Sequence, residues 1–237
     1  MLYLDNAATT PLLPEVRKVM INYMVDNFGN PSSIYKIGRM NKIAVEEARK
    51  SIAETIGACP DDIFFTSGGT ESDNWVLESA AESATESDSA HIIVSAIEHP
   101  AVINKCIQLK KRGCDVDYIK TDKNGIINTD DLISKIRDDT KLISVMLVNN
   151  EIGTIQPVKN VCNIAAEYAI PVHTDAVAAY GHIPVNVKEL GVDYLSVSAH
   201  KIGGAKGTGF LYAKAANINP YIYGCLLYTS PSPRDYA

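Results

Sequence analysis

Short apolar runs alternate with amphipathic stretches along most of this chain, and this alternation constrains the fold more than any other feature. The apolar runs predict strands at 63–66, 91–95, 116–120, 142–148, 171–174, 194–198 and 209–213. Helical periodicity predicts helices that begin near 14, 37 and 70, and others at 101–112, 130–137 and 158–168. The apolar side of the second helix, which includes Ile37, Ala48 and Ile56, is expected to face inward. Because strands separated by helices need crossover connections, we predict an α/β fold with a mostly parallel central sheet and helices on both faces.

The composition excludes several classes of function. The chain has 237 residues, of which 46% are hydrophobic, and a formal net charge of −6, so it lacks the basic balance of a nucleic-acid-binding protein. Its apolar stretches are too short to span a bilayer. The five cysteines have no CxxC spacing, which argues against a zinc ribbon or a disulfide framework and for reduced thiols in a cytoplasmic protein. We expect no bound metal, and we expect Cys59, Cys106, Cys114 and Cys162 to be buried packing residues.

The first polar loop after a predicted strand is Ser67-Gly68-Gly69-Thr70. In parallel sheets, ligands bind beyond the carboxyl ends of the strands. Glycines let the backbone approach a ligand closely, and the start of the following helix offers free N–H groups to an anion. Thr70 either caps this helix or binds a phosphate through its hydroxyl. The loop is not a P-loop, and the chain contains no GxGxxG.

Three further strand ends carry polar side chains, and each has two interpretations. His99 either starts a helix before a proline, or places a flat ring against a planar cofactor or in proton transfer. Asn150 either completes a turn with Asn149 or hydrogen-bonds a ligand. Asp175 either caps the next segment or pairs with a cation such as a protonated ring nitrogen, since a buried carboxylate needs such a partner.

Lys201 follows the predicted strand 194–198 and stands beside His200, just before Gly203-Gly204. A lysine in a loop is usually solvated, but a desolvated amine in a cationic setting has a depressed pKa and can form a Schiff base. A phosphate cradle, a stacking ring, a carboxylate for a ring nitrogen and a strand-end lysine are together the parts needed to hold pyridoxal 5'-phosphate.

The order of these motifs resembles that of the fold-type I pyridoxal-phosphate enzymes, and specifically of cysteine desulfurases of the NifS/IscS kind. The matching segments are 3–11, 28–33, 66–74, 98–99, 148–153, 173–176 and 198–201. The resemblance runs from about residue 2 to residue 224, and it implies the large domain of the fold-type I enzymes.

Carried over position by position, the resemblance implies that Lys201 holds the cofactor covalently and removes the substrate's Cα proton. His99 would stack on the ring and take part in catalysis, and Asp175 would pair with the ring nitrogen. The other cofactor-binding residues that it implies are Gly69, Thr70, Asn150, Ala178, Ser198 and His200.

The roles implied for this second group differ. Thr70, Ser198 and His200 would bind the phosphate, with the backbone of Gly69, and Asn150 would contact the oxygen side of the ring. Ala178 departs from the family, which has a glutamine at this position. Loss of that amide hydrogen bond is expected to weaken cofactor binding by about 1 kcal/mol without abolishing it.

The resemblance also implies an activity: conversion of L-cysteine to L-alanine, with the sulfur passed to a cysteine of the enzyme as a persulfide. In the family, the sulfur acceptor serves iron–sulfur cluster assembly or tRNA thiolation, and the enzyme is a cytoplasmic homodimer. The alternatives are a class-V aminotransferase or selenocysteine lyase, which share the cofactor site, and a fragment that binds the cofactor without catalysis.

The resemblance ends near Gly224, and the segment beyond it has two prolines and no amphipathic period. We therefore expect an N-terminal segment at 1–13, a pyridoxal-phosphate-binding large domain at 14–224, and an aberrant tail at 225–237 that is unrelated to the family. The small domain and the persulfide-forming cysteine would then be missing, because Cys225 lies well before the family's position for that residue. The chain as written is expected to turn over little or no cysteine.

Overall fold

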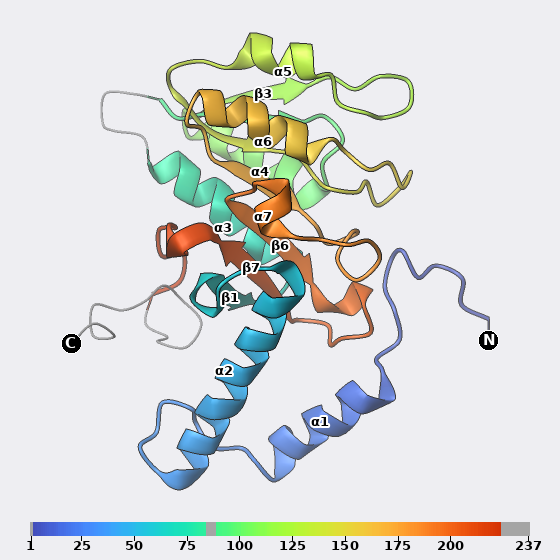
Figure 1. The fold of residues 1–237 in the computed structure, drawn as a ribbon, viewed down its shortest axis with the longest axis vertical. Helices are drawn as coiled ribbons and strands as arrows, with labels where there is room; N and C mark the ends of the chain where they lie inside the picture. The colour runs from blue at the N-terminus through green and yellow to red at the C-terminus, as the bar shows by residue number, and fades with distance from the viewer. Residues whose placement is uncertain (1, 84–88, 224–237) are drawn as a thin grey trace.

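A computed structural model of the chain describes residues 2–83 and 89–223, and within these the apolar runs form one seven-stranded sheet (Figure 1). The strands are β1 (Ile63–Thr66), β2 (His91–Ser95), β3 (Asp115–Ile119), β4 (Thr140–Ser144), β5 (Val172–Asp175), β6 (Tyr194–Ser198) and β7 (Gly209–Ala213). Their order is β1-β7-β6-β5-β4-β2-β3, and within this sheet only β7 runs antiparallel to its neighbours. The predicted α/β fold with a mostly parallel sheet is confirmed.

One predicted strand is too long. The regular part of β4 ends at Ser144 rather than at residue 148. The chain nevertheless stays beside β5, because Val145 donates to the carbonyl of His173 at 3.0 Å and Leu147 donates to the carbonyl of Asp175 at 2.9 Å. The segment after β4 therefore reaches the carboxyl edge of the sheet while it is still attached to the neighbouring strand.

Helices cover both faces of the sheet, because successive residues of a strand point to opposite sides. They are α1 (Pro14–Val25), α2 (Lys36–Ile56), α3 (Gly69–Glu82), α4 (Pro100–Lys111), α5 (Thr129–Lys135), α6 (Val158–Glu167) and α7 (Val187–Leu190). Ile92 and Leu142 belong to a core that contains buried residues of α3 and α4. Their neighbours Ile93 and Ile143 belong to a second core, formed with α5, α6, α7 and the end of α2.

The first two helices depart from the expected burial. Figure 1 shows α1 and the first half of α2 extending away from the sheet, and α1 contains no buried residue. On α2, Ile56 is buried against the sheet as expected, but Ile37 and Ala48 are exposed. The prediction of a continuous inward face was wrong because only the last turns of α2 reach the second core.

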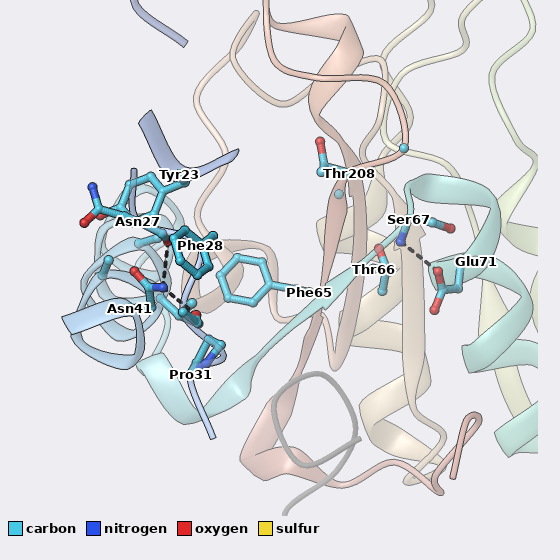
Figure 2. A pocket seen from close by; sticks show the side chains of 16 residues that line it. Tyr23, Asn27, Phe28, Pro31, Asn41, Phe65, Thr66, Ser67, Glu71 and Thr208 are labelled. Carbon is cyan, nitrogen blue, oxygen red and sulfur yellow. Dashed lines mark hydrogen bonds between the residues drawn. The ribbon is translucent and has the colours of Figure 1, made fainter. Parts of the chain in front are cut away.

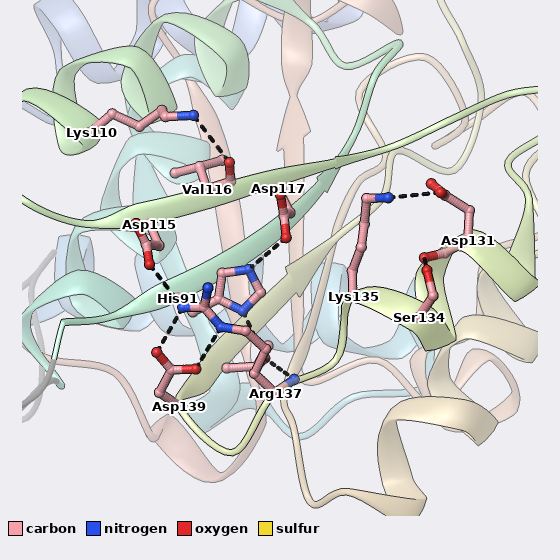
Figure 3. Close-up of polar contacts among 11 residues, drawn as sticks. His91, Lys110, Asp115, Val116, Asp117, Asp131, Ser134, Lys135, Arg137 and Asp139 are labelled. Carbon is pink, nitrogen blue, oxygen red and sulfur yellow. Dashed lines mark hydrogen bonds and ion pairs between the residues drawn. The ribbon is translucent and has the colours of Figure 1, made fainter.

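A polar cluster ties three strands together at their amino ends (Figure 3). Arg137 forms ion pairs with Asp115 at 3.0 Å and Asp139 at 2.7 Å. The buried His91 makes a hydrogen bond with Thr140 at 2.8 Å, and burial lowers the pKa of its imidazole. This cluster lies at the edge opposite to the loops that follow the strands, so we assign it a structural role.

The cysteines are only partly buried. Cys106 and Cys162 lie in the interior as expected, whereas Cys114 is partly exposed and Cys59 is exposed, just before the short turn that leads into β1. The expectation of a buried Cys59 was therefore wrong. The predicted tail at 225–237 lies outside the described residues.

Candidate active site

The structure brings all nine residues predicted for the site around one cavity of about 210 Å³. It lies beyond the carboxyl ends of the strands, where ligands of parallel sheets bind. The predicted residues that line it are Gly69, Thr70, His99, Asn150, Asp175, Ala178, Ser198, His200 and Lys201. Four further residues complete the wall: Ala8, Asp73, Met146 and Val177.

The glycine loop forms the start of α3. Gly68 is the residue before the helix and has a φ of +144°, a conformation that disfavours residues with a side chain. A Cβ atom on Gly69 would lie 2.5 Å from a methyl carbon of Val177. Thr70 is thus inside the first turn and does not cap the helix, so the capping interpretation was wrong. The N–H groups of this turn have no acceptor within the helix, which favours an anion here.

His99 starts a helix, as the first interpretation predicts, and it also lines the cavity. It precedes α4, where its Nδ1 accepts a hydrogen bond from the backbone N–H of Ala101 at 3.1 Å. That contact places the proton of a neutral ring on Nε2. The same ring lines the cavity, so the helix start fixes the position of the imidazole.

The two neighbouring asparagines differ in position: Asn149 forms the turn, and Asn150 lines the cavity. Asn149 forms the turn, since its Oδ1 accepts from the backbone N–H groups of Glu151 and Ile152 at 3.0 Å each, and its Nδ2 donates to the carbonyl of Ile97 at 2.9 Å. Asn150 lines the cavity, and its Nδ2 donates to Glu151 at 3.1 Å. The side chain of Asn150 is therefore not needed for the turn.

Asp175 is the last residue of β5 and is only 4% exposed. Its Oδ1 accepts from the backbone N–H of Val177 at 2.8 Å, so the expected cap is present. Burial raises the pKa of this carboxyl group, while the Val177 N–H, the His99 ring and the positive charge of Lys201 act in the opposite direction. A carboxylate in this position gains from a cationic partner in the cavity.

Lys201 is held by the N-terminal segment of the chain. Its Nζ donates to the carbonyl oxygens of Ala7 and Ala8, the latter at 2.9 Å. Close by, the Nδ1 of His200 makes a hydrogen bond with the hydroxyl of Thr9 at 3.0 Å. None of these N-terminal residues was predicted to belong to the site. Apolar patterning cannot reveal them, because they contact Lys201 and His200 through backbone carbonyls and one hydroxyl.

Asp73 was also missed, although a signal was present. It lies on α3 between the buried residues Ser72 and Trp75, in a stretch of the helix that faces the sheet. A carboxyl group at such a position is unusual unless it is paired or functional.

Glu98 is hydrogen-bonded to Met146 of the cavity wall and supports a prediction on pH dependence. Its Oε1 accepts from the Ser95 hydroxyl and from the N–H of Met146, while its Oε2 has no hydrogen-bond partner among the described residues. Burial raises its pKa to about 8. Because the folded state binds this proton more tightly than the unfolded state, stability falls as the pH rises from about 4.5 to about 8.

Glu98→Gln is therefore expected to be more stable than the parent protein at pH 9, by on the order of a few kcal/mol, with the difference vanishing near pH 4. Urea unfolding at pH 4, 7 and 9 measures this. A difference that stayed constant with pH would contradict the predicted proton uptake.

A larger groove of about 740 Å³ lies apart from this cavity (Figure 2). It runs between the first two helices and β1, and Phe28 and Phe65 face each other across it in Figure 2. Asn41 fixes one wall by donating to the carbonyl of Asn27 at 2.7 Å. None of the nine predicted residues lines the groove.

Comparison with known proteins identifies the family. The class-V aminotransferase family matches residues 2–236 of the chain. The chain belongs to the class-V aminotransferase family. Members of this family depend on pyridoxal phosphate. The chain is 51% identical over 223 residues to the cysteine desulfurase IscS of Methanosarcina thermophila, covering 94% of this chain and 55% of the relative. The corresponding protein of Dictyoglomus turgidum is 52% identical over 223 residues, covering 94% and 56%.

Solved structures of similar proteins agree with the fold. A NifS-like protein superposes with a TM-score of 0.93 at 39% identity, covering 98% of this chain and 64% of that protein. A structure described as SspA in complex with cysteine gives a TM-score of 0.93 at 37% identity, covering 99% and 70%. The chain spans about half the length of the curated relatives it matches.

Proposed function

We propose that this chain forms the cofactor-binding part of a pyridoxal-phosphate-dependent cysteine desulfurase, which converts L-cysteine to L-alanine and passes the sulfur to an enzyme cysteine. The observation that carries the proposal is the convergence of nine motif residues, spread from Gly69 to Lys201, on one cavity. The class-V relatives that bear the name cysteine desulfurase support the same assignment.

The cavity residues fit the cofactor at each end. The first turn of α3 offers N–H groups and the Thr70 hydroxyl to a phosphate, and Ser198 and His200 line the same cavity. Asp175, buried and lacking a full countercharge, suits a protonated ring nitrogen. His99 offers a flat ring from the start of α4. We assign the cofactor-binding roles on this basis.

The proposed mechanism uses the same residues. Bound pyridoxal phosphate supplies an electron sink for the charge left at the substrate Cα. Lys201 would hold the cofactor covalently through its Nζ, and once the amino group of the substrate had displaced that Nζ from the cofactor, the freed amine would accept the Cα proton. For both roles the Nζ must leave the carbonyls of Ala7 and Ala8. His99 presents Nε2 as a proton donor or acceptor, because Nδ1 is engaged with the backbone of Ala101.

The substrate and partners extend this proposal. The SspA relative solved with cysteine supports L-cysteine as the substrate. The IscS names of the relatives support a sulfur acceptor that serves iron–sulfur cluster assembly or tRNA thiolation. A homodimer is supported by the exposed apolar residues of the first two helices, which include Val19, Met24 and Met40.

A cytoplasmic location is the last element of the proposal. The described cysteines are all free, which fits a reducing compartment. Among the described residues, no helix combines the length and apolar character that a membrane span requires. A relative from Candida maltosa carries the name mitochondrial cysteine desulfurase, so the family occurs in more than one compartment.

The experiment that tests the proposal is titration of the purified chain with pyridoxal phosphate. We expect a saturable visible absorbance band, and borohydride reduction followed by peptide mapping should place the adduct on Lys201. L-cysteine is then added, and alanine and sulfide are measured. Absence of a saturable band, or an adduct spread over surface lysines, would contradict the proposed site. A band without alanine is the result expected of this chain alone, which spans about half the length of the relatives named cysteine desulfurase. The desulfurase assignment would be refuted if a protein that carries this site and spans the full length of those relatives bound the cofactor but released no alanine from L-cysteine.

A further inference from the structure

Asp73 is a buried carboxyl group of the cavity wall that the proposed mechanism does not use. It projects from α3 and is 1% exposed. It lines the same cavity as Asp175, and its Oδ1 has no hydrogen-bond partner among the described residues. Two carboxyl groups that share one buried site cannot both ionise cheaply.

The nearest basic group does not neutralise Asp73. The Nε2 of His173 lies 3.5 Å from the Asp73 Oδ1. However, both nitrogens of this buried imidazole are engaged by hydroxyl groups, with Ser144 at 2.8 Å and Ser196 at 2.9 Å. Burial lowers the pKa of His173 to about 3, so the ring is neutral at physiological pH. His173 therefore supplies no positive charge to Asp73.

Two acidic groups also act on Asp73. Asp175 and Glu98 both disfavour its ionisation, and only a hydrogen bond from Ser196 favours it. Burial is the largest cause and raises the pKa of Asp73 well above its ordinary value. Asp175 differs, because it has the Val177 N–H at 2.8 Å and the positive charge of Lys201 nearby. A single negative charge is therefore more stable on Asp175 than on Asp73.

We propose that Asp73 is a positioning residue of the ring end of the cavity: it remains a neutral acid, so that Asp175 is the only carboxylate of this pair that faces the ring nitrogen. The part of this inference that concerns the ring nitrogen rests on the proposed function. The neutral state of Asp73 is a property of the folded chain, and it is measurable without cofactor.

The first experiment uses the full chain without cofactor. Infrared difference spectroscopy between the parent protein and Asp73→Asn should show the carbonyl stretch of a neutral carboxylic acid at pH 7. In an Asp175→Asn background, Asp73 loses its charged neighbour, so the pH midpoint of this band should move down by about one unit or more. A purely structural Asp73 would not show this coupling. The proposal is overturned if the band is missing at pH 7, or if its midpoint is the same in both backgrounds.

The second experiment measures the dissociation constant of pyridoxal phosphate. Asp73→Asn keeps a neutral polar group and should bind within about threefold of the parent, whereas Asp175→Asn should bind at least tenfold more weakly, which corresponds to about 1.4 kcal/mol. An equal loss in the two variants would mean that the charge of Asp73 is used, and would overturn the inference. Failure of every variant and of the parent to bind would refute the proposed function instead, while the infrared result would still decide the state of Asp73.

Discussion

Lys201→Ala is expected to abolish the visible band of bound pyridoxal phosphate and the adduct trapped by borohydride. Lys201 is the only lysine that lines the described cavity, so no other amine of this wall can replace it. In any active desulfurase that carries this site, loss of the group proposed to take the Cα proton should also slow alanine formation by roughly 10²–10⁴-fold. Absorbance titration, peptide mapping and an alanine assay measure the three effects.

The matched control for this variant is Lys206→Ala. Lys206 is exposed and lies in the loop before β7, outside the cavity wall. It should leave the band and the adduct unchanged. Lys201→Ala should also unfold at nearly the same temperature as the parent, because it loses only two hydrogen bonds to the N-terminal segment. An adduct that persisted in Lys201→Ala would show that the covalent role belongs to another lysine.

Trp75→Ala is expected to lower the free energy of unfolding by about 3–5 kcal/mol, which is a large share of the 5–15 kcal/mol typical of a domain. Trp75 is 2% exposed and packs edge-on against Phe64 at 5.5 Å between ring centroids. Its Nε1 donates to the carbonyl of Asn219 at 2.6 Å, and its ring stacks on Tyr221 at 6.4 Å. The substitution thus removes a core side chain and leaves an acceptor without its donor.

Urea or thermal unfolding measures this loss, with Ile107→Ala as the matched control. Ile107 belongs to the neighbouring helix α4 but is 44% exposed, so its truncation should cost less than 1 kcal/mol. Because Trp75 anchors the helix that begins at Gly69, we also expect weaker cofactor binding in Trp75→Ala. Equal losses from the two substitutions would contradict the assigned packing.

Much of the fold was predictable from local patterns. Successive side chains of a strand point to opposite faces of the sheet, so neighbouring residues of β2 and β4 had to enter different cores. Ile92 and Leu142 lie in one core, and Ile93 and Ile143 lie in the other. The loops that follow the parallel strands all leave from the carboxyl edge of the sheet, so these were the loops that could be expected to form a common site. The burial of α2 could not be predicted in the same way, because an apolar stripe shows that a helix face will be covered but not by what. Ile37 has the right periodicity and is exposed all the same.

The candidate site was predictable where its residues lie at or just beyond the end of a strand. Asp175 ends β5 and Lys201 lies in the short turn after β6, and both line the cavity. Asp73 was missed because it comes from the middle of a helix, and its contact with the cavity depends on how α3 crosses the sheet. The role of Thr70 was ambiguous because a threonine suits both the position that caps a helix and a position in its first turn that binds an anion. These positions differ by only one or two residues, so the choice depends on where the helix begins, which the structure places at Gly69.

The position of β7 has a consequence for the order of folding. β1, the strand that leads into the glycine loop, lies at the edge of the sheet, and its one strand partner among the described residues is β7, which comes after the other six strands in chain order. During translation, β1 therefore waits unpaired until residues 209–213 have left the ribosome. Such a late, long-range pairing slows folding and leaves an apolar segment open to aggregation. The start of α3 is fixed to the sheet only at that stage, so we expect nascent chains that lack β7 to be poor binders of the cofactor.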